Sequence, residues 1–215
     1  MLRTQLIEIR EKIIYASSLV EKMLNMTVEG LIDSNMEKLD HAMEYENLIN
    51  HLEIEIEEMC VMMIARFQPE AKDLRTIISI LKLNNDFERM GDQVTNVIYA
   101  SKYIIERPAL KQLLSIHNMA KDTIGMLQKS MDAYIKEDTA AAKEICIFDD
   151  VIDGYRNDII RELITYMLSD PANIERCLKL MNIAENLERI ADLCTNIAEN
   201  TIYIKEGKVI KHNTY

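Results

Sequence analysis

The chain has 215 residues, of which 48% are hydrophobic and 28% charged, a balance typical of a folded, soluble protein. Its 3 prolines and 5 glycines are too few for the many turns of an all-β sandwich or barrel. The net charge of −11 argues against binding to nucleic acid or to an anionic membrane surface, and it favours attraction of cations or of a basic partner.

The first segment, residues 2–33, carries charged side chains throughout and matches neither a signal peptide nor a membrane span. A cytoplasmic location is therefore expected. None of the four cysteines forms a CxxC pair, and most fall at apolar helix positions, so we expect reduced, buried thiols. These cysteines are Cys60, Cys146, Cys177 and Cys194.

Long amphipathic segments, separated by the prolines, predict six helices and an all-α fold. Asp170 is expected to cap the last helix, with Pro171 in its first turn. The lengths exceed those of most globular helices and are typical of bundles. The predicted helices span residues 2–33, 36–67, 71–105, 109–136, 139–168 and 172–205.

The third and sixth helices carry the same apolar seam, offset by 100 residues and with 3-4-3-4-3 spacing. Upstream, residues 34–50 match residues 137–153. This internal repeat predicts two tandem three-helix bundles, with domains at 1–107 and 108–215. The seam residues are Ile80, Leu83, Phe87, Met90, Val94 and Val97, and Leu180, Ile183, Leu187, Ile190, Cys194 and Ile197.

Each seam helix also carries two acids four positions apart, Glu88 with Asp92 and Glu188 with Asp192. Like charges at this spacing destabilise a helix by a few tenths of a kcal/mol. Both pairs lie in the shared string ERxxDxxTN, whose final asparagines, Asn96 and Asn196, continue the same predicted stripe. A cation bound between the acids would offset their repulsion, so we hypothesise a metal site in each repeat.

The second helix of each repeat supplies further oxygen ligands, Glu46 with Asn50 and Asp149 with Asp153. If the second and third helices of a repeat are antiparallel neighbours, about four oxygen-bearing side chains face one another at each site. An all-oxygen set favours magnesium, calcium, manganese or ferric iron, and makes zinc less expected. The alternative is a solvated outer face of an acidic protein.

Catalytic motifs of the common classes are absent from the sequence, which contains no GxxxxGK[ST], GxGxxG or GxSxG. Di-metal carboxylate bundles place a histidine three residues after a glutamate, where this chain has Gly91 and Ala191. We therefore expect no enzyme; a carboxylate-ligated metalloenzyme and a helical scaffold without metal are the alternatives. Arg89 and Arg189 are expected to pair locally with Asp86 and Glu185.

The strings FQPEAKDLRTIISILKLNNDFERMGDQVTNV and ITYMLSDPANIERCLKLMNIAENLERIADLCTNIAENTIYIKEG resemble the PhoU family of phosphate-signalling proteins. The family hallmark is an E/D-xxx-D motif on the third helix of each of two bundles, which Glu88/Asp92 and Glu188/Asp192 match. The resemblance extends from the first helix to about Gly207.

The resemblance implies a cytoplasmic regulator without established catalytic activity. Such a protein links the ATPase subunit of a phosphate ABC transporter to a sensor histidine kinase, and it represses the starvation response when phosphate is plentiful. The resemblance also implies homodimers, and iron, zinc, nickel, magnesium or calcium on the motif surface. Because Glu46 and Asn50 replace Asp149 and Asp153, the first site is expected to bind metal more weakly. The sequence shows no glycine-rich or arginine-clustered anion site.

Overall fold

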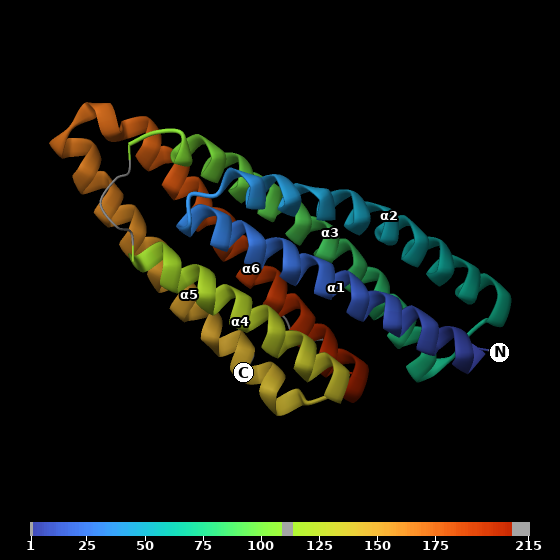
Figure 1. Ribbon diagram of the computed structural model, residues 1–215. Coiled ribbons are helices and arrows are strands. Elements are labelled where there is room, and N and C mark those ends of the chain that lie inside the picture. Colours follow the sequence, from blue (N-terminus) through green and yellow to red (C-terminus); the bar gives the residue numbers. More distant parts are fainter. Residues whose placement is uncertain (1, 109–113, 208–215) are drawn as a thin grey trace.

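The structure is a computed structural model that describes residues 2–108 and 114–207, and within these ranges it is built from helices without strands (Figure 1). The predicted all-α fold is confirmed, and the helix bounds agree with the predicted ones within about two residues. The predicted start of the fourth helix, residue 109, lies outside the described residues. The helices are α1 (Leu2–Ile32), α2 (Met36–Phe67), α3 (Ala71–Ile105), α4 (Leu114–Lys136), α5 (Thr139–Ser169) and α6 (Ile174–Glu206), with a 3₁₀ turn at Pro171–Asn173 before α6.

Equivalent side chains begin the second helix of each repeat. The Asn35 Oδ1 accepts a hydrogen bond from the backbone N–H of Lys38 at 3.0 Å, and caps α2. Asp138, at the equivalent position, accepts bonds from the backbone N–H groups of Ala140 and Ala141 at 3.0 and 3.1 Å, and caps α5. These caps satisfy N–H groups that have no partner within the helix, which explains why both helices start where they do.

The cap predicted at Asp170 is also present. Its Oδ1 accepts a bond from the backbone N–H of Ala172 at 3.0 Å, and Pro171 occupies the first position of the 3₁₀ turn. Proline fits there because its ring already holds the helical φ and the missing N–H would have no partner. The turn takes up residues 172 and 173, the first two of the predicted helix, so α6 itself begins at Ile174.

The core follows α3 and α6, which lie side by side along the long axis of the molecule (Figure 1). α1 and α2 pack on α3 to form one three-helix bundle, while α4 and α5 pack on α6 to form the other. A further contact between α1 and α4 also joins the bundles. All twelve predicted seam residues are buried, so the two-bundle architecture expected from the repeat is confirmed.

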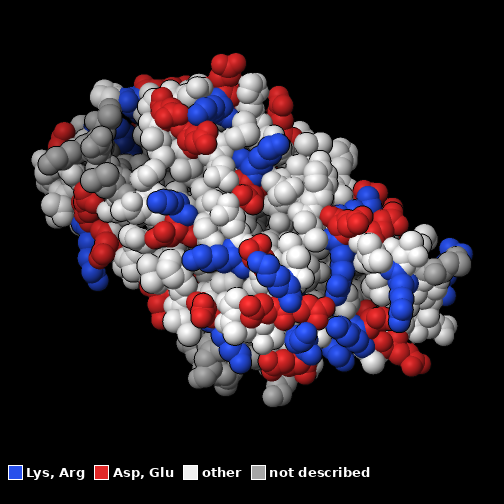
Figure 2. Space-filling view, turned by 60° about the horizontal axis from the view of Figure 1, so that its bottom comes forward, with Lys and Arg blue, Asp and Glu red and all other residues white. Residues whose placement is uncertain are grey.

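The predicted division between residues 107 and 108 falls in the connection between the two bundles, and the expectation that neither half folds alone stays a prediction. Three of the four cysteines, Cys60, Cys177 and Cys194, are buried thiols as expected, and Cys146 is half-buried. None of the helices in the described part of the chain is long and apolar enough to cross a membrane. On the face drawn in Figure 2, acidic and basic side chains are interleaved.

Candidate functional site

The second repeat brings its four predicted acids together between α5 and α6. Burial, together with the negative charges of Asp192, Asp153, Glu188 and Asp150, raises the pKa of Asp149 to about 7. Such an effect requires these carboxylates to lie close to one another. We call Asp149, Asp153, Glu188 and Asp192 the second acid cluster; its members come from facing turns of neighbouring helices, as the sequence predicts.

Arg156 also belongs to this cluster, and sequence reasoning missed it. Its Nη1 lies 2.8 Å from the Glu188 Oε1 and 4.0 Å from the Asp153 Oδ1. The pKa of Glu188 is raised by burial and by Asp192, whereas Arg156 opposes that shift. The spacing of three residues between Asp153 and Arg156 is a signal that could have revealed this guanidinium. One positive charge therefore already compensates part of the second acid cluster.

In the first repeat, the contacts between α2 and α3 determine which residues face one another. The Thr95 hydroxyl lies 4.0 Å from the Met43 sulfur, and the Asn84 Nδ2 donates to the Glu53 carbonyl oxygen at 2.7 Å. Between these two contacts, α2 runs antiparallel to α3. The stretch that carries Glu46 and Asn50 therefore faces the stretch that carries the ExxxD motif, as predicted.

Glu53 is a further acid of the first repeat that sequence reasoning did not include. Burial raises the pKa of Glu88, and the charges of Asp92 and Glu53 raise it further. We call Glu53, Glu88 and Asp92, with Glu46 and Asn50 opposite them, the first acid cluster. Under the offset of 103 residues that aligns the second helices, Glu53 is equivalent to Arg156. The two clusters thus carry opposite charges at one equivalent position.

The structure places the two motif asparagines at the contact between the repeats, away from the predicted stripe of acids. Asn96 Nδ2 donates to Asn186 Oδ1 at 3.3 Å, and Asn196 Nδ2 donates to Asp86 Oδ1 at 3.4 Å. The stripe prediction for Asn96 and Asn196 therefore needs correction. At 3.6 residues per turn, a side chain eight positions beyond the glutamate is rotated by roughly 80° around the helix. This rotation turns both asparagines towards the other repeat.

The two motif arginines differ in their local pairing. Arg89 Nη1 lies 3.7 Å from the Asp86 Oδ1, as the spacing predicts. The expected ion pair between Glu185 and Arg189 is not formed in the described structure, where both side chains are exposed. Arg189 thus has no demonstrated role in the second acid cluster.

The donor chemistry of both clusters suits a hard cation, because the predicted ligands are carboxylate and amide oxygens. Among residues 2–108 and 114–207, however, no three or more Asp, Glu, His or Cys side chains are gathered closely enough to hold a metal ion. A cation would require these flexible carboxylates to close around it. The clusters therefore fit a metal by charge and ligand type, without a preformed coordination shell.

Comparison with known proteins connects this arrangement to one family. The family model of the PhoU domain matches the chain twice, at residues 13–100 and 116–201. The "Phosphate-specific transport system accessory protein PhoU homolog" of Aquifex aeolicus is 38% identical over 208 residues, covering 97% of this chain and 94% of that protein. The homologue of the same name from Pseudomonas aeruginosa is 34% identical, with 97% of this chain and 86% of that protein covered.

Solved structures agree with the sequence comparison. The crystal structure of PhoU from Pseudomonas aeruginosa superimposes with a TM-score of 0.94 at 33% identity, covering 97% of this chain and all of that chain. The phosphate transport system regulatory protein PhoU from Streptococcus pneumoniae gives a TM-score of 0.88 at 26% identity, covering 99% and 100% of the two chains. With two matching domains and close relatives over nearly its whole length, this chain belongs to the PhoU family.

Proposed function

We propose that this protein is an accessory regulator of phosphate transport that acts by docking on other proteins. The observation that carries this proposal is the 38% identity to a phosphate-specific transport system accessory protein over 97% of the chain. The relative from Streptococcus pneumoniae is likewise described as a regulatory protein of phosphate transport. These names belong to accessory and regulatory proteins, which favours the regulator over the metalloenzyme alternative.

In more detail, we propose that this protein is a cytoplasmic adaptor that forms a homodimer. One partner is the ATPase subunit of a phosphate ABC transporter, and the other is a sensor histidine kinase. The adaptor represses the phosphate-starvation response when phosphate is plentiful. The family resemblance of the sequence supports these partners, and the long helical faces provide surfaces on which folded partners can dock.

The proposal includes metal binding at the acid clusters. A bound cation would neutralise the repelling carboxylates, and its binding to the docking-competent form would be linked to partner affinity. Glu88 and Asp92 would hold it with Glu46 and Glu53 in the first repeat. In the second repeat, Arg156 competes with a cation for Glu188 because it already lies 2.8 Å from that carboxylate.

This competition leads to a ranking of the two clusters. The first cluster has Glu53 where the second has the guanidinium of Arg156, so no positive charge at this position competes there with a bound cation. We therefore propose that the first cluster binds a hard cation more tightly than the second. The sequence alone favoured the opposite order, because it compared Glu46 and Asn50 with Asp149 and Asp153 and did not include Glu53 or Arg156.

A genetic experiment tests the regulatory role. Deleting the gene should leave phosphate-starvation genes active in phosphate-rich medium, and re-expression of the wild-type chain should repress them again. Re-expression of the Glu88→Gln, Asp92→Asn variant should restore repression only partly if the first cluster serves docking. Asp158→Asn is a matched control, because Asp158 is an exposed acid on α5 outside both clusters. An unchanged starvation response after deletion would refute the regulatory proposal.

A further inference from the structure

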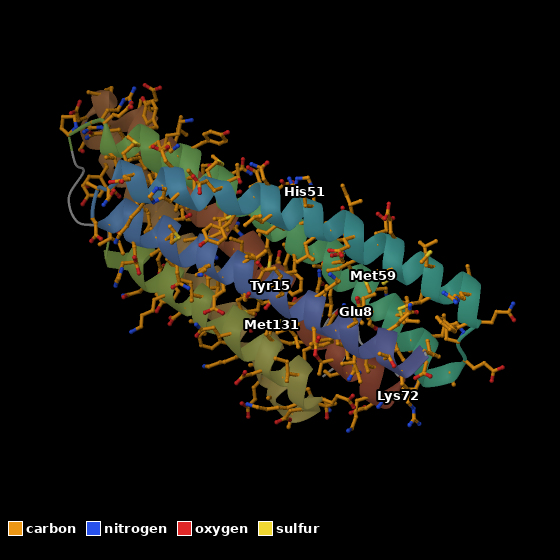
Figure 3. The ribbon with its side chains drawn as sticks, turned by 45° about the vertical axis from the view of Figure 1, so that its right-hand side comes forward. Glu8, Tyr15, His51, Met59, Lys72 and Met131 are labelled. Carbon is orange, nitrogen blue, oxygen red and sulfur yellow. The ribbon has the colours of Figure 1, made fainter. Side chains whose placement is uncertain are left out.

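A basic pocket lies at the end of the molecule where α1 and α3 begin, far from both acid clusters. The pocket has a volume of about 310 Å³, and its charged lining residues are Arg3, Arg10, Lys72, Asp73 and Glu137. Figure 3 shows Lys72 at this end, beside the first turns of α1. Sixteen residues of α3 separate Lys72 from Glu88, which corresponds to roughly 24 Å along the helix.

Glu137, in the turn between α4 and α5, is the carboxylate on which the cations of this pocket converge. Its Oε1 lies 3.4 Å from the Arg10 Nη2, and its Oε2 lies 3.3 Å from the Lys72 Nζ and 3.5 Å from the Lys205 Nζ. These three cations come from α1, α3 and α6. Burial alone would raise the pKa of Glu137, but the hydrogen bond and charge of Lys72 and the charge of Arg10 outweigh it and lower the pKa.

The cations of the pocket outnumber its carboxylates. Arg3, Arg10 and Lys72 line the pocket with Asp73 and Glu137, which leaves one positive charge uncompensated, and Lys205 adds a further cation beside Glu137. This excess occurs in a chain whose net charge is −11, so general composition does not account for it. A ligand that displaced Glu137 would meet an excess of two positive charges in this lining, which a dianion would balance.

A further guanidinium lies on the same end of α3, outside the lining of this pocket. Arg75 follows Lys72 by one helical turn and approaches the end of α6, where its Cζ lies 3.8 Å from the position of a Cβ atom placed on Gly207. The Arg75 Nε is buried and has no hydrogen-bond partner among the described residues. Arg75 therefore adds to this end of the bundle a positive charge that no ion pair among the described residues compensates.

We propose that this basic pocket binds a phosphate group, and that Glu137 is an internal anion which the ligand displaces from Arg10 and Lys72. Once Glu137 is displaced, the cations Arg3, Arg10 and Lys72 exceed Asp73 by two positive charges, which a phosphate dianion matches. The guanidinium of Arg10 can donate two parallel hydrogen bonds to it, and Lys72 adds a point charge. The proposal goes beyond the regulatory function proposed above and does not rest on it, because neither acid cluster contributes a residue.

The test is a calorimetric titration of the full chain in chelator-treated buffer at constant ionic strength. Inorganic phosphate and ATP are the two probes, because a free phosphate and a nucleotide share the chemistry of the site. Saturable binding of either probe supports the proposal, and the better probe identifies the source of the phosphate group. A chloride titration gives the background, and a heat signal equal to that of chloride for both probes would overturn the proposal.

Two variants distinguish a binding site from a purely structural set of ion pairs. Arg10→Gln removes a donor and should weaken binding about fivefold, whereas Glu137→Gln removes the competing carboxylate and should tighten it about fivefold. Arg161→Gln, at an exposed arginine of α5, should leave the affinity unchanged. An affinity that does not rise in Glu137→Gln would overturn the role of this carboxylate, and circular dichroism checks that each variant is folded.

Discussion

The contact between the two repeats contains a buried carboxylate whose replacement should stabilise the protein. Asp86 is 8% exposed, and its Oδ1 accepts a hydrogen bond from Asn196 and lies 3.7 Å from the Arg89 guanidinium. At the equivalent position of the second repeat, the neutral Asn186 accepts the matching bond from Asn96. The change Asp86→Asn therefore keeps the acceptor and removes the buried charge.

The expected gain follows from the pKa of Asp86, which burial raises from 3.8 to about 6 against the opposing effects of Asn196 and Arg89. The folded state then binds the proton more tightly than the unfolded state does. Its stability consequently falls as the pH rises from about 4 to about 6, and the full loss remains above pH 6. A difference of about two pKa units corresponds to about 3 kcal/mol at pH 8, and to about half of that at pH 5.

Urea unfolding at pH 5 and pH 8, followed by circular dichroism, measures this difference. Asp86→Asn should be more stable than the wild type at both pH values, with a gain about twice as large at pH 8. Losing the partner of Arg89 should matter little, because Arg89 is mostly exposed. The exposed Asp158→Asn variant is the control. A gain that is the same at both pH values, or a loss at pH 8, would refute the account based on burial.

Three further changes test the packing and the charges. Gly125→Ala should raise the free energy of unfolding by about 1 kcal/mol, because a Cβ at this mid-helix position meets nothing within 4 Å. Gly30→Ala should lower it, because its Cβ would lie 2.7 Å from the Leu39 side chain. Thermal melts in which both variants shift the melting temperature in the same direction would contradict this contrast. Arg156→Glu should increase bound Mn²⁺ in elemental analysis of protein purified without chelator, and no increase over Arg161→Glu would argue against competition by Arg156. Each three-helix half expressed alone should lack a cooperative thermal melt, because α3 and α6 bury apolar side chains against each other in the intact chain. A cooperative melt of each separate half would show that the halves fold independently.

Local features of the sequence were sufficient to predict the helices. Apolar spacing identified the seams, and the prolines identified where segments end, because periodicity and proline geometry are properties of neighbouring residues. Asp170 and Pro171 illustrate this: the predicted cap is present, and only the 3₁₀ geometry of the first turn was missed. The sequence also indicated that the second and third helices of a repeat face each other, because short connections make consecutive helices antiparallel neighbours.

The composition of the sites could be predicted only in part, because distant residues complete them. A heptad wheel placed Asn96 on the stripe of acids, whereas the true helical period turns it towards the other repeat. The pocket around Glu137 combines α1, α3, α6 and the turn between α4 and α5, and no local string of sequence contains it. Such convergence depends on how the two bundles are packed, which periodicity does not specify.

The two repeats share the caps and seam positions that build their helices, but they differ in charge at an equivalent surface position. Asn35 and Asp138 cap equivalent helices, and all seam positions are apolar in both halves. By contrast, Glu53 is replaced by Arg156 in the other repeat. A helix cap or a seam position serves the same backbone in both halves, so both halves need it. A change of charge at an equivalent position leaves the backbone unaltered and changes what the surface attracts, so the two halves present chemically different faces on one shared framework.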